Sequence, residues 1–184
     1  MMAAGHVDQE IMEQMVTNKG DDVLALSRQQ GVMLVFLRHF GCTFCRRGLA
    51  AISEKRAAIE AKGLKIVFVH MTTSDVADVY FERYEIDQPT YISDPECRFY
   101  TAFGLTKGTF TQLFGLQTWI RGFQAGIVEG HGIGPRLGDD FQMPGVFILQ
   151  NGEIVESFVH KLASDQPDYD ALIRNCCGLP EAFG

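Results

Sequence analysis

Residues 32–47 read Val32-Met-Leu-Val-Phe-Leu-Arg-His-Phe-Gly-Cys42-Thr-Phe-Cys45-Arg-Arg47. The unbroken apolar run that opens this stretch predicts a central β-strand covered on both faces. A Phe-Gly step then turns the chain, and Cys42 and Cys45 open a segment with the pattern of a helix. We therefore expect a buried strand that leads directly into a helix with two thiols at its start.

The start of a helix is a favourable place for a reactive thiol. Backbone N–H groups are unpaired there and the helix dipole is positive, so a thiol ionises more easily to the nucleophilic thiolate. Cys42 and Cys45 are about one helical turn apart, so their sulfurs can be bonded to each other without moving the helix. His39, Arg46 and Arg47 supply positive charge nearby. The cysteine pair is therefore the candidate redox site.

Composition indicates a globular protein. With 184 residues, 46% of them hydrophobic and 11% aromatic, the chain can bury one sizeable core. We expect a single domain over residues 1–184 with a helical extension over about residues 1–30. The formal charge of −7 argues against nucleic acid and anionic membranes as partners. The sequence shows neither a leader nor an apolar run of membrane length, so we expect a cytoplasmic protein.

Helices are expected on both sides of the central strand. Apolar residues recur every four positions over residues 7–16, and Asp21 or Asp22 can cap a second short helix. The cysteine-bearing helix is expected over residues 43–62 and is followed by an apolar strand over residues 64–70. Strand, helix and strand then form a parallel unit, with the cysteines at the carboxyl end of its first strand.

The middle of the chain predicts a helix, a short strand and a second helix. Ser74 or Asp75 can cap a helix, which is followed by a short strand over residues 90–93. A turn at Asp94-Pro95 leads into a helix that has Cys97 in its first turn.

The last third of the chain predicts an insertion and then a hairpin. Residues 106–138 are irregular and end in a glycine-rich segment that predicts a loop. The Asn-Gly pair at residues 151–152 separates two strand-like runs, so residues 146–149 and 154–159 should form an antiparallel hairpin. Asp168 can cap a final helix.

Four sequence blocks together resemble a known family. They are Phe36-Leu-Arg-His-Phe-Gly-Cys-Thr-Phe-Cys-Arg46, Asp94-Pro95, Phe103-Gly-Leu105 and Gly138-Asp-Asp-Phe-Gln142. In these blocks the chain resembles the peroxiredoxin-like branch of the alkyl hydroperoxide reductase and thiol-specific antioxidant (AhpC/TSA) family, to which selenoprotein L is related. The resemblance spans roughly residues 20–175. It implies an α/β protein with a thioredoxin-like fold, in which helices flank a central mixed sheet and an insertion precedes the C-terminal hairpin.

The resemblance also implies an activity. Cys42 and Cys45 would cycle between dithiol and disulfide and reduce hydroperoxides or disulfides, making the protein an antioxidant thiol oxidoreductase without a cofactor or metal. Thioredoxin, glutathione or a similar thiol would return the pair to the dithiol. The resemblance leaves a homodimer as an option.

Two positions depart from the peroxiredoxin pattern. Cys42 stands three residues before Cys45, where typical peroxiredoxins have a threonine. Pro144 stands where they bring an arginine to the sulfur, and it resembles the cis-proline that faces the CxxC of thioredoxins. By the thioredoxin comparison Cys42 attacks the substrate, which is the assignment that we expect, whereas the peroxiredoxin comparison gives that role to Cys45. Thr43, Arg46, Arg47 and Pro144 are the candidates to support the thiolate or bind substrate.

Two readings from other classes remain. Cys42 and Cys45 could hold a structural zinc ion together with Cys176 and Cys177, although adjacent cysteines form a poor second ligand pair. Alternatively, the chain is a thioredoxin-fold interaction protein without catalysis. Cys97 could serve as a further resolving thiol, although cysteines in such a helix are more often inert.

Overall fold

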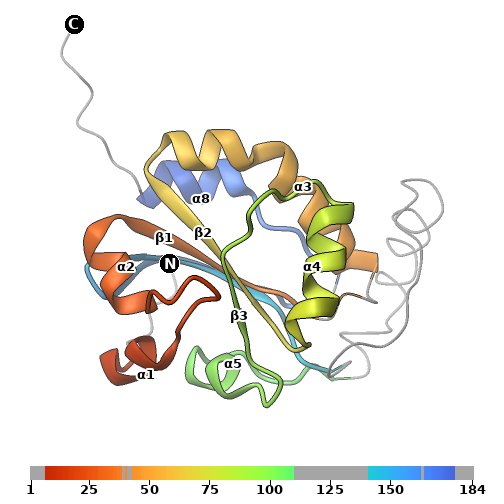
Figure 1. Cartoon of the computed structure of the whole chain (residues 1–184), viewed down its shortest axis with the longest axis horizontal. Coiled ribbons are helices and arrows are strands. Elements are labelled where there is room, and N and C mark those ends of the chain that lie inside the picture. Colours follow the sequence, from red (N-terminus) through yellow and green to blue (C-terminus); the bar gives the residue numbers. More distant parts are fainter. Residues whose placement is uncertain (1–6, 39, 41–42, 110–140, 163, 177–184) are drawn as a thin grey trace, which may run out of the picture.

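The computed structural model of the 184-residue chain describes residues 7–38, 40, 43–109, 141–162 and 164–176. Within these residues, helices and strands follow one another in the order that the sequence predicts (Figure 1). The helices are α1 (Gln9–Gln14), α2 (Val23–Gln29), α3 (Thr43–Ala61), α4 (Ser74–Arg83), α5 (Arg98–Ala102) and α8 (Tyr169–Cys176). The strands are β1 (Gly31–Phe36), β2 (Leu64–His70), β3 (Tyr91–Ser93), β4 (Gly145–Gln150) and β5 (Glu153–Val159).

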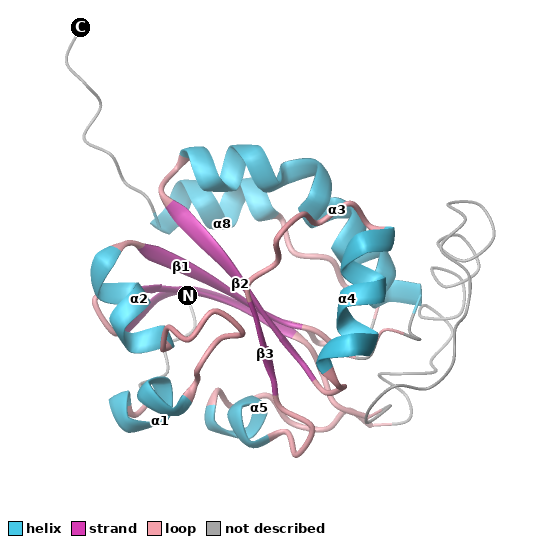
Figure 2. Ribbon diagram, viewed as in Figure 1, coloured by secondary structure: helices cyan, strands magenta, loops and turns pink. Residues whose placement is uncertain are grey.

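The described strands form one mixed sheet in the order β3-β2-β1-β4-β5. β1 pairs in parallel with β2, and β2 in parallel with β3, whereas β4 runs antiparallel to both β1 and β5. β1 is thus the central strand, as its unbroken apolar sequence predicts. Figure 2 shows helices on both faces of this sheet. The predicted α/β class, with a mixed sheet flanked by helices, is confirmed.

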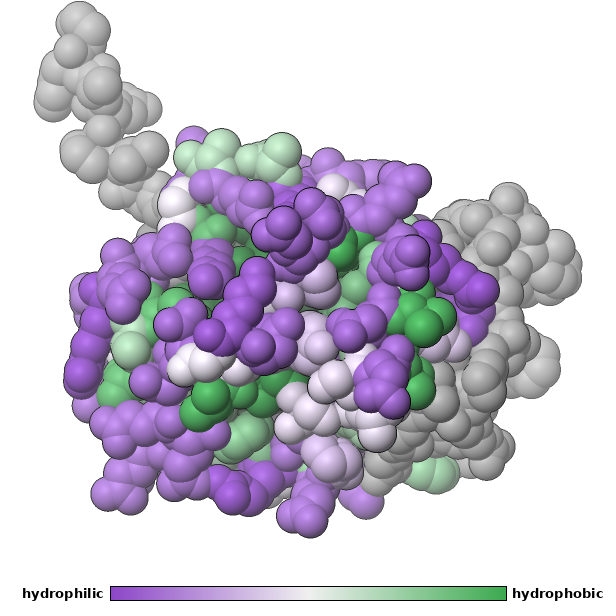
Figure 3. Space-filling view, viewed as in Figure 1, coloured by the Kyte–Doolittle hydropathy of each residue, from purple (hydrophilic) through white to green (hydrophobic). Residues whose placement is uncertain are grey.

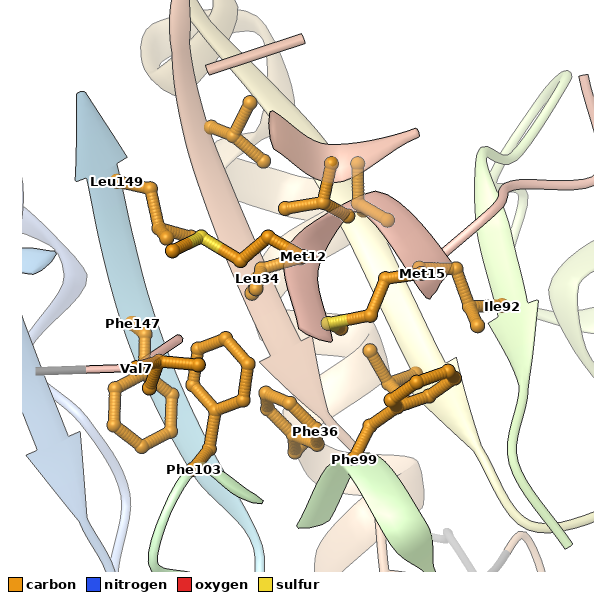
Figure 4. Close-up of a cluster of buried hydrophobic side chains, with 14 of the residues drawn as sticks. Val7, Met12, Met15, Leu34, Phe36, Ile92, Phe99, Phe103, Phe147 and Leu149 are labelled. Atoms are coloured by element: carbon orange, nitrogen blue, oxygen red, sulfur yellow. The ribbon is translucent and has the colours of Figure 1, made fainter. Parts of the chain in front are cut away.

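Side chains of β1 alternate between two hydrophobic cores. Leu34 and Phe36 belong to a first core, in which they meet residues of α1, α2 and α5, such as Met12 (Figure 4). Met33 and Val35 belong to a second core, which they share with residues of α3, α4 and α8. α3, which carries Cys45, therefore lies on the second face of the sheet, together with α8.

The hairpin of β4 and β5 is fixed by its glycines. Asn151 and Gly152 adopt positive φ angles of 53° and 79°, as the predicted Asn-Gly turn requires. The backbone N–H of Gly152 donates to the Ser27 hydroxyl at 2.9 Å, which ties the turn to α2. At the other end of the hairpin, a Cβ on Gly145 would lie 2.8 Å from the Leu105 side chain. Glycine thus allows the start of β4 to pack closely against the segment after α5.

The predicted N-terminal cap of α2 is confirmed, whereas the predicted cap of α4 is wrong. Asp22 caps α2, because its carboxylate accepts a hydrogen bond from the Ala25 N–H at 2.7 Å. The expectation that Ser74 or Asp75 caps α4 is wrong. Thr73 occupies the cap position without a side-chain hydrogen bond, and Asp75 already lies in the first turn, where its negative charge complements the helix dipole.

The start of α5 also differs from the expectation. Cys97 precedes the helix as its cap residue, with a positive φ of 56°, and does not lie in the first turn. Asp94 performs the capping, because its buried carboxylate accepts hydrogen bonds from the N–H groups of Arg98 at 2.9 Å and Phe99 at 2.8 Å. This carboxylate satisfies N–H groups that the short helix leaves unpaired.

Most of the predicted insertion, including the glycine-rich segment, lies outside the described residues, since residues 110–140 are not described. On the face shown in Figure 3, hydrophilic side chains surround smaller areas of hydrophobic ones. Among the helices that the structure describes, none combines the length and the apolar character needed to span a bilayer.

Candidate functional site

Cys45 lies in the first turn of α3, where the chain has just left the central strand β1. The residue is 8% exposed and lines a cavity of about 30 Å³. A cavity of this size has room for only one or two water-sized groups. Cys42 and His39 lie outside the described residues, and for Thr43 the structure describes its place at the start of α3.

Polar groups from four separate segments meet around this cavity. Arg38 follows β1, Pro144 precedes β4, His160 follows β5 and Tyr169 begins α8. All four line the same cavity as Cys45. Because β1 runs antiparallel to β4, the last residue of β1 and the first residue of β4 are paired and lie at the same end of the sheet. The sheet topology therefore gathers residues that are far apart in the sequence around one sulfur.

Pro144 was predicted to face the cysteine pair, and it shares the cavity with Cys45. Its likeness to the cis-proline of thioredoxins does not extend to its peptide bond, because no peptide bond among the described residues is cis. The trans form is the ordinary state of an X-Pro bond and is favoured by about 0.5–1 kcal/mol. In the structure, the carbonyl oxygen of Pro144 forms a hydrogen bond with the His160 ring.

His160 was not singled out in the sequence. Its Nδ1 lies 3.1 Å from the Pro144 carbonyl oxygen, and a carbonyl only accepts, so this nitrogen carries the proton. Burial lowers the pKa of His160 to about 4 and outweighs the opposing effects of the Pro144 hydrogen bond and the Asp165 charge. His160 is therefore neutral near neutral pH. A single histidine after an edge strand has no sequence pattern that would identify it.

Two buried tyrosines, one in each core, have a pKa that the charge of Cys45 affects. Tyr169 belongs to the second core, and burial, followed by the charge of Cys45, raises its pKa well above the usual range. Tyr100 belongs to the first core, and its hydroxyl is bound to the backbone carbonyl oxygens of Leu37 and Val69. Burial is again the main cause of its raised pKa, with a smaller contribution from Cys45. Both hydroxyls stay protonated at physiological pH.

Arg38 is the cation that the sequence analysis missed. It is 6% exposed and lies on the wall of the cavity with Cys45. Arginines are seldom this deeply buried, and this one shares the cavity wall with a thiol. Its sequence signal is an arginine directly after an apolar strand, two positions beyond the end of β1.

Arg46 and Arg47 differ although they are neighbours. Arg46 is buried, and its guanidinium donates to the Phe40 carbonyl oxygen at 2.8 Å and to the Tyr80 hydroxyl at 3.3 Å. The guanidinium also lies 5.4 Å from the centre of the Tyr80 ring, which is cation–π distance. These contacts join the loop before α3 to α4. Arg47 instead lines a separate open groove with Lys161.

The other cysteines do not join this cavity within the described residues. Cys97 packs against the first core, and its Sγ lies 3.2 Å from the Met71 Sδ. Cys176 ends α8, and Cys177 lies outside the described residues. The part of the chain that the structure describes contains no cluster of three or more histidine, cysteine or acidic side chains placed to bind a metal. Because Cys42 and Cys177 are not described, this finding leaves the zinc reading untested.

Comparison with known proteins identifies relatives of this architecture. A family model described as AhpC/TSA antioxidant enzyme matches residues 51–162, a segment that begins after the cysteine pair. A chloroplastic thioredoxin-like protein, AAED1 of Arabidopsis thaliana, is 26% identical over 168 residues. The match covers 83% of this chain and 64% of that protein, so the chain spans less than two thirds of the length of this relative.

Solved structures with the same fold include peroxiredoxins. Peroxiredoxin Q of Xanthomonas campestris superposes with a TM-score of 0.60 at 13% identity and covers 84% of each chain. A cysteine-to-serine mutant of peroxiredoxin 6 from Arenicola marina also gives a TM-score of 0.60, at 11% identity, over 86% of this chain and 65% of the other. At such identities the similarity shows the fold alone, which is the thioredoxin-like α/β fold that the sequence predicts.

Proposed function

Because this chain belongs to the AhpC/TSA antioxidant enzyme family, we propose that it reduces hydroperoxides with Cys42 and Cys45 as a redox-active pair. The matched segment begins after the pair, so the proposal for these two residues rests on sequence and geometry. The observation that carries it is the position of Cys45, at the start of a helix and on the wall of a small cavity that Arg38 also lines.

In the proposed first step, the Cys45 thiolate attacks one oxygen of the hydroperoxide. A sulfur–oxygen bond forms, the oxygen–oxygen bond breaks, and the departing alkoxide takes up the proton that the thiol lost. The products are a sulfenic acid on Cys45 and an alcohol or water. The thioredoxin comparison favoured Cys42 as the attacking residue, but the peroxiredoxin comparison and the cavity at Cys45 favour the assignment of this step to Cys45.

Two features favour the thiolate form of Cys45. The N–H groups in the first turn of α3 are positive, and so is the buried guanidinium of Arg38 on the cavity wall. An opposite charge within about 4–6 Å lowers the pKa of an acid by about 1–3 units. Thr43 would add its N–H group at the helix start, and Pro144 would form the facing wall. Arg46 would act indirectly, by holding the loop before α3.

In the proposed second step, the Cys42 sulfur attacks the sulfenic acid. A Cys42–Cys45 disulfide forms and water leaves, so the peroxide has been reduced by the two electrons of the dithiol. Thioredoxin, glutathione or a similar thiol would then reduce the disulfide. The spacing of three supports this step, because it allows both sulfurs to bond without moving the helix.

The cavity favours a peroxide over a disulfide as the group that Cys45 attacks. A peroxide has two oxygens, and the cavity of about 30 Å³ has room for about two water-sized groups. A disulfide on another protein would have to bring a bulkier sulfur to a residue that is 8% exposed. Disulfide exchange would therefore use Cys42.

The test uses the full chain as two single variants, Cys42→Ser and Cys45→Ser, with Cys97→Ser as the matched control. Each reduced protein receives one equivalent of hydroperoxide and a sulfenic-acid trap, and the mass of each cysteine peptide is measured. We expect a trapped adduct on Cys45 in Cys42→Ser, no adduct on Cys42 in Cys45→Ser, and wild-type behaviour in Cys97→Ser. An adduct on Cys42 with none on Cys45 would reverse the assignment.

A further inference from the structure

A second pocket lies at the opposite end of the sheet from Cys45. Its wall includes Lys65 and Ile66 at the start of β2 and Thr90 just before β3, whereas the Cys45 cavity lies at the end of β1. These three strands run parallel, so their starts and their ends lie at opposite ends of the sheet. No described residue lines both spaces. We propose that this second pocket binds a phosphate group, independently of the redox chemistry at Cys45.

Three positively charged side chains line this pocket, each from a different segment. Lys19 comes from the loop between α1 and α2, Arg56 from α3 and Lys65 from β2. Among the described residues of the wall, Glu60 supplies the single carboxylate. Positive charge therefore exceeds negative charge here, although the whole chain has a formal charge of −7. This local imbalance favours an anion as the ligand.

Two of the three cations are held in place by backbone carbonyl groups. The Lys19 Nζ donates to the Gln88 carbonyl oxygen at 2.9 Å, and the Arg56 guanidinium donates to the Asp87 carbonyl oxygen. The Arg56 Nε also donates to the Glu60 carboxylate at 2.7 Å. A guanidinium has five N–H donors, so these two contacts leave donors for a ligand. Because the cations are already positioned, less conformational entropy is lost when an anion binds.

The wall also contains polar groups that the protein does not satisfy. The Lys65 ammonium forms no hydrogen bond or ion pair with a described residue. Thr90 is 6% exposed, and its hydroxyl likewise has no partner in the part of the chain that the structure describes. Buried hydroxyl groups are nearly always hydrogen-bonded. Thr90 therefore indicates that this pocket receives a polar group from outside the chain.

The backbone of β2 adds a further donor. The Phe68 N–H points toward β3, where it donates to the Thr90 carbonyl oxygen at 2.9 Å. Successive residues of a strand point to alternate sides, so the N–H of Ile66, two residues earlier, points the same way. β3 begins at Tyr91, which pairs with Phe68, so no described strand lies beside Ile66 on that side. An oxygen of a bound anion can accept this hydrogen bond.

The size of the pocket matches a phosphate group. Its volume is about 160 Å³, against about 30 Å³ for the cavity at Cys45. Such a volume has room for about five water-sized groups. Phosphate consists of one phosphorus and four oxygen atoms, and its oxygens accept strong hydrogen bonds from ammonium and guanidinium groups. Lys19, Arg56 and Lys65 provide both of these donor types.

The test is a calorimetric titration of the full chain with inorganic phosphate, in which chloride keeps the ionic strength constant. We expect saturable binding of one phosphate per chain. The affinity should fall about tenfold in Lys65→Met and in Arg56→Met, because each variant removes one charged donor. The matched control, Lys55→Met, removes a positive charge that pairs with Asp170 outside the pocket, and it should keep the wild-type affinity.

The absence of saturable binding, an equal loss in Lys55→Met, or full affinity in both pocket variants would overturn the proposal. If Arg56→Met does not fold, Lys65→Met and Lys19→Met make the same comparison. Methyl phosphate is titrated in parallel to identify the source of the phosphate group. Binding of both probes supports a phosphorylated molecule as the ligand, and binding of inorganic phosphate alone supports the free ion. Cys45→Ser should bind phosphate like the wild type, so failure of the proposed function is a separate result.

Discussion

At the scale of single residues, the candidate site consists of Cys45 and the residues that line a small cavity with it. Cys45 and Pro144 were identified from the sequence, because CxxC after an apolar strand and proline before a hairpin are patterns that local spacing reveals. Arg38, His160 and Tyr169 were not, although they line the same cavity. His160 and Tyr169 belong to no motif, and nothing within the Phe36–Arg46 block marks Arg38 as facing the thiol. Only the folded sheet brings these three residues to one cavity.

Arg38 should set the reactivity of Cys45 through its charge. In Arg38→Met the side chain keeps much of its volume but loses its positive charge, so we expect the pKa of Cys45 to rise by at least about one unit and the peroxide reaction at neutral pH to slow about tenfold. Stopped-flow measurement of the reaction over a range of pH tests this. The control Arg28→Met removes an exposed charge on α2 and should change neither quantity. A wild-type pH profile in Arg38→Met would show that this charge does not reach the sulfur.

At the scale of elements, the order of helices and strands could be predicted, while their ends could be predicted only in part. Alternation and helical periodicity depend on neighbouring residues, so the hairpin and α3 were expected within a few residues of their bounds. Capping depends on backbone angles that distant contacts also influence, and thus Thr73 replaced the expected caps of α4. Similarly, Arg46 and Arg47 have the same sequence context, yet only Arg46 turns toward α4.

Arg46 should stabilise the protein by joining the loop before α3 to Tyr80 on α4. Arg46→Met leaves the buried Phe40 carbonyl without this partner, so we expect the free energy of unfolding to fall by about 2–3 kcal/mol. Arg47→Met, one residue further along the helix, should change it by less than about 1 kcal/mol. Urea unfolding of both variants measures the difference. Equal effects would contradict the role assigned to Arg46.

At the scale of the whole molecule, the mixed sheet separates two cores, and a buried histidine in the second affects global stability. His70 is buried among aromatic rings, including those of Phe40 and Tyr91, and its Nε2 has no hydrogen-bond partner among the described residues. Burial lowers its pKa from 6.5 to about 4, against weaker opposing effects of Thr72 and Asp78. The folded state therefore resists protonation of His70.

Stability should fall as the solution becomes more acidic than pH 6.5, because the unfolded chain then binds a proton that folded His70 does not bind. The contribution of His70 is fully present above pH 6.5 and is lost between 6.5 and about 4, with a total of roughly 3 kcal/mol. His160, whose pKa is also lowered to about 4, adds a loss of the same sign. In His70→Asn the slope of unfolding free energy against pH should decrease in this window. An unchanged slope would contradict the buried neutral state of His70.

The central claim is that Cys42 and Cys45 form a pair that reduces hydroperoxides, and its most direct test is a single turnover of the reduced full chain. One equivalent of hydroperoxide is added without any reductant, and the intact mass and the cysteine peptides are determined. The account predicts that one peroxide is consumed per chain, that the protein loses two hydrogen atoms, and that a Cys42–Cys45 disulfide is found. An unreacted peroxide, or oxidation confined to Cys97, Cys176 and Cys177, would contradict it.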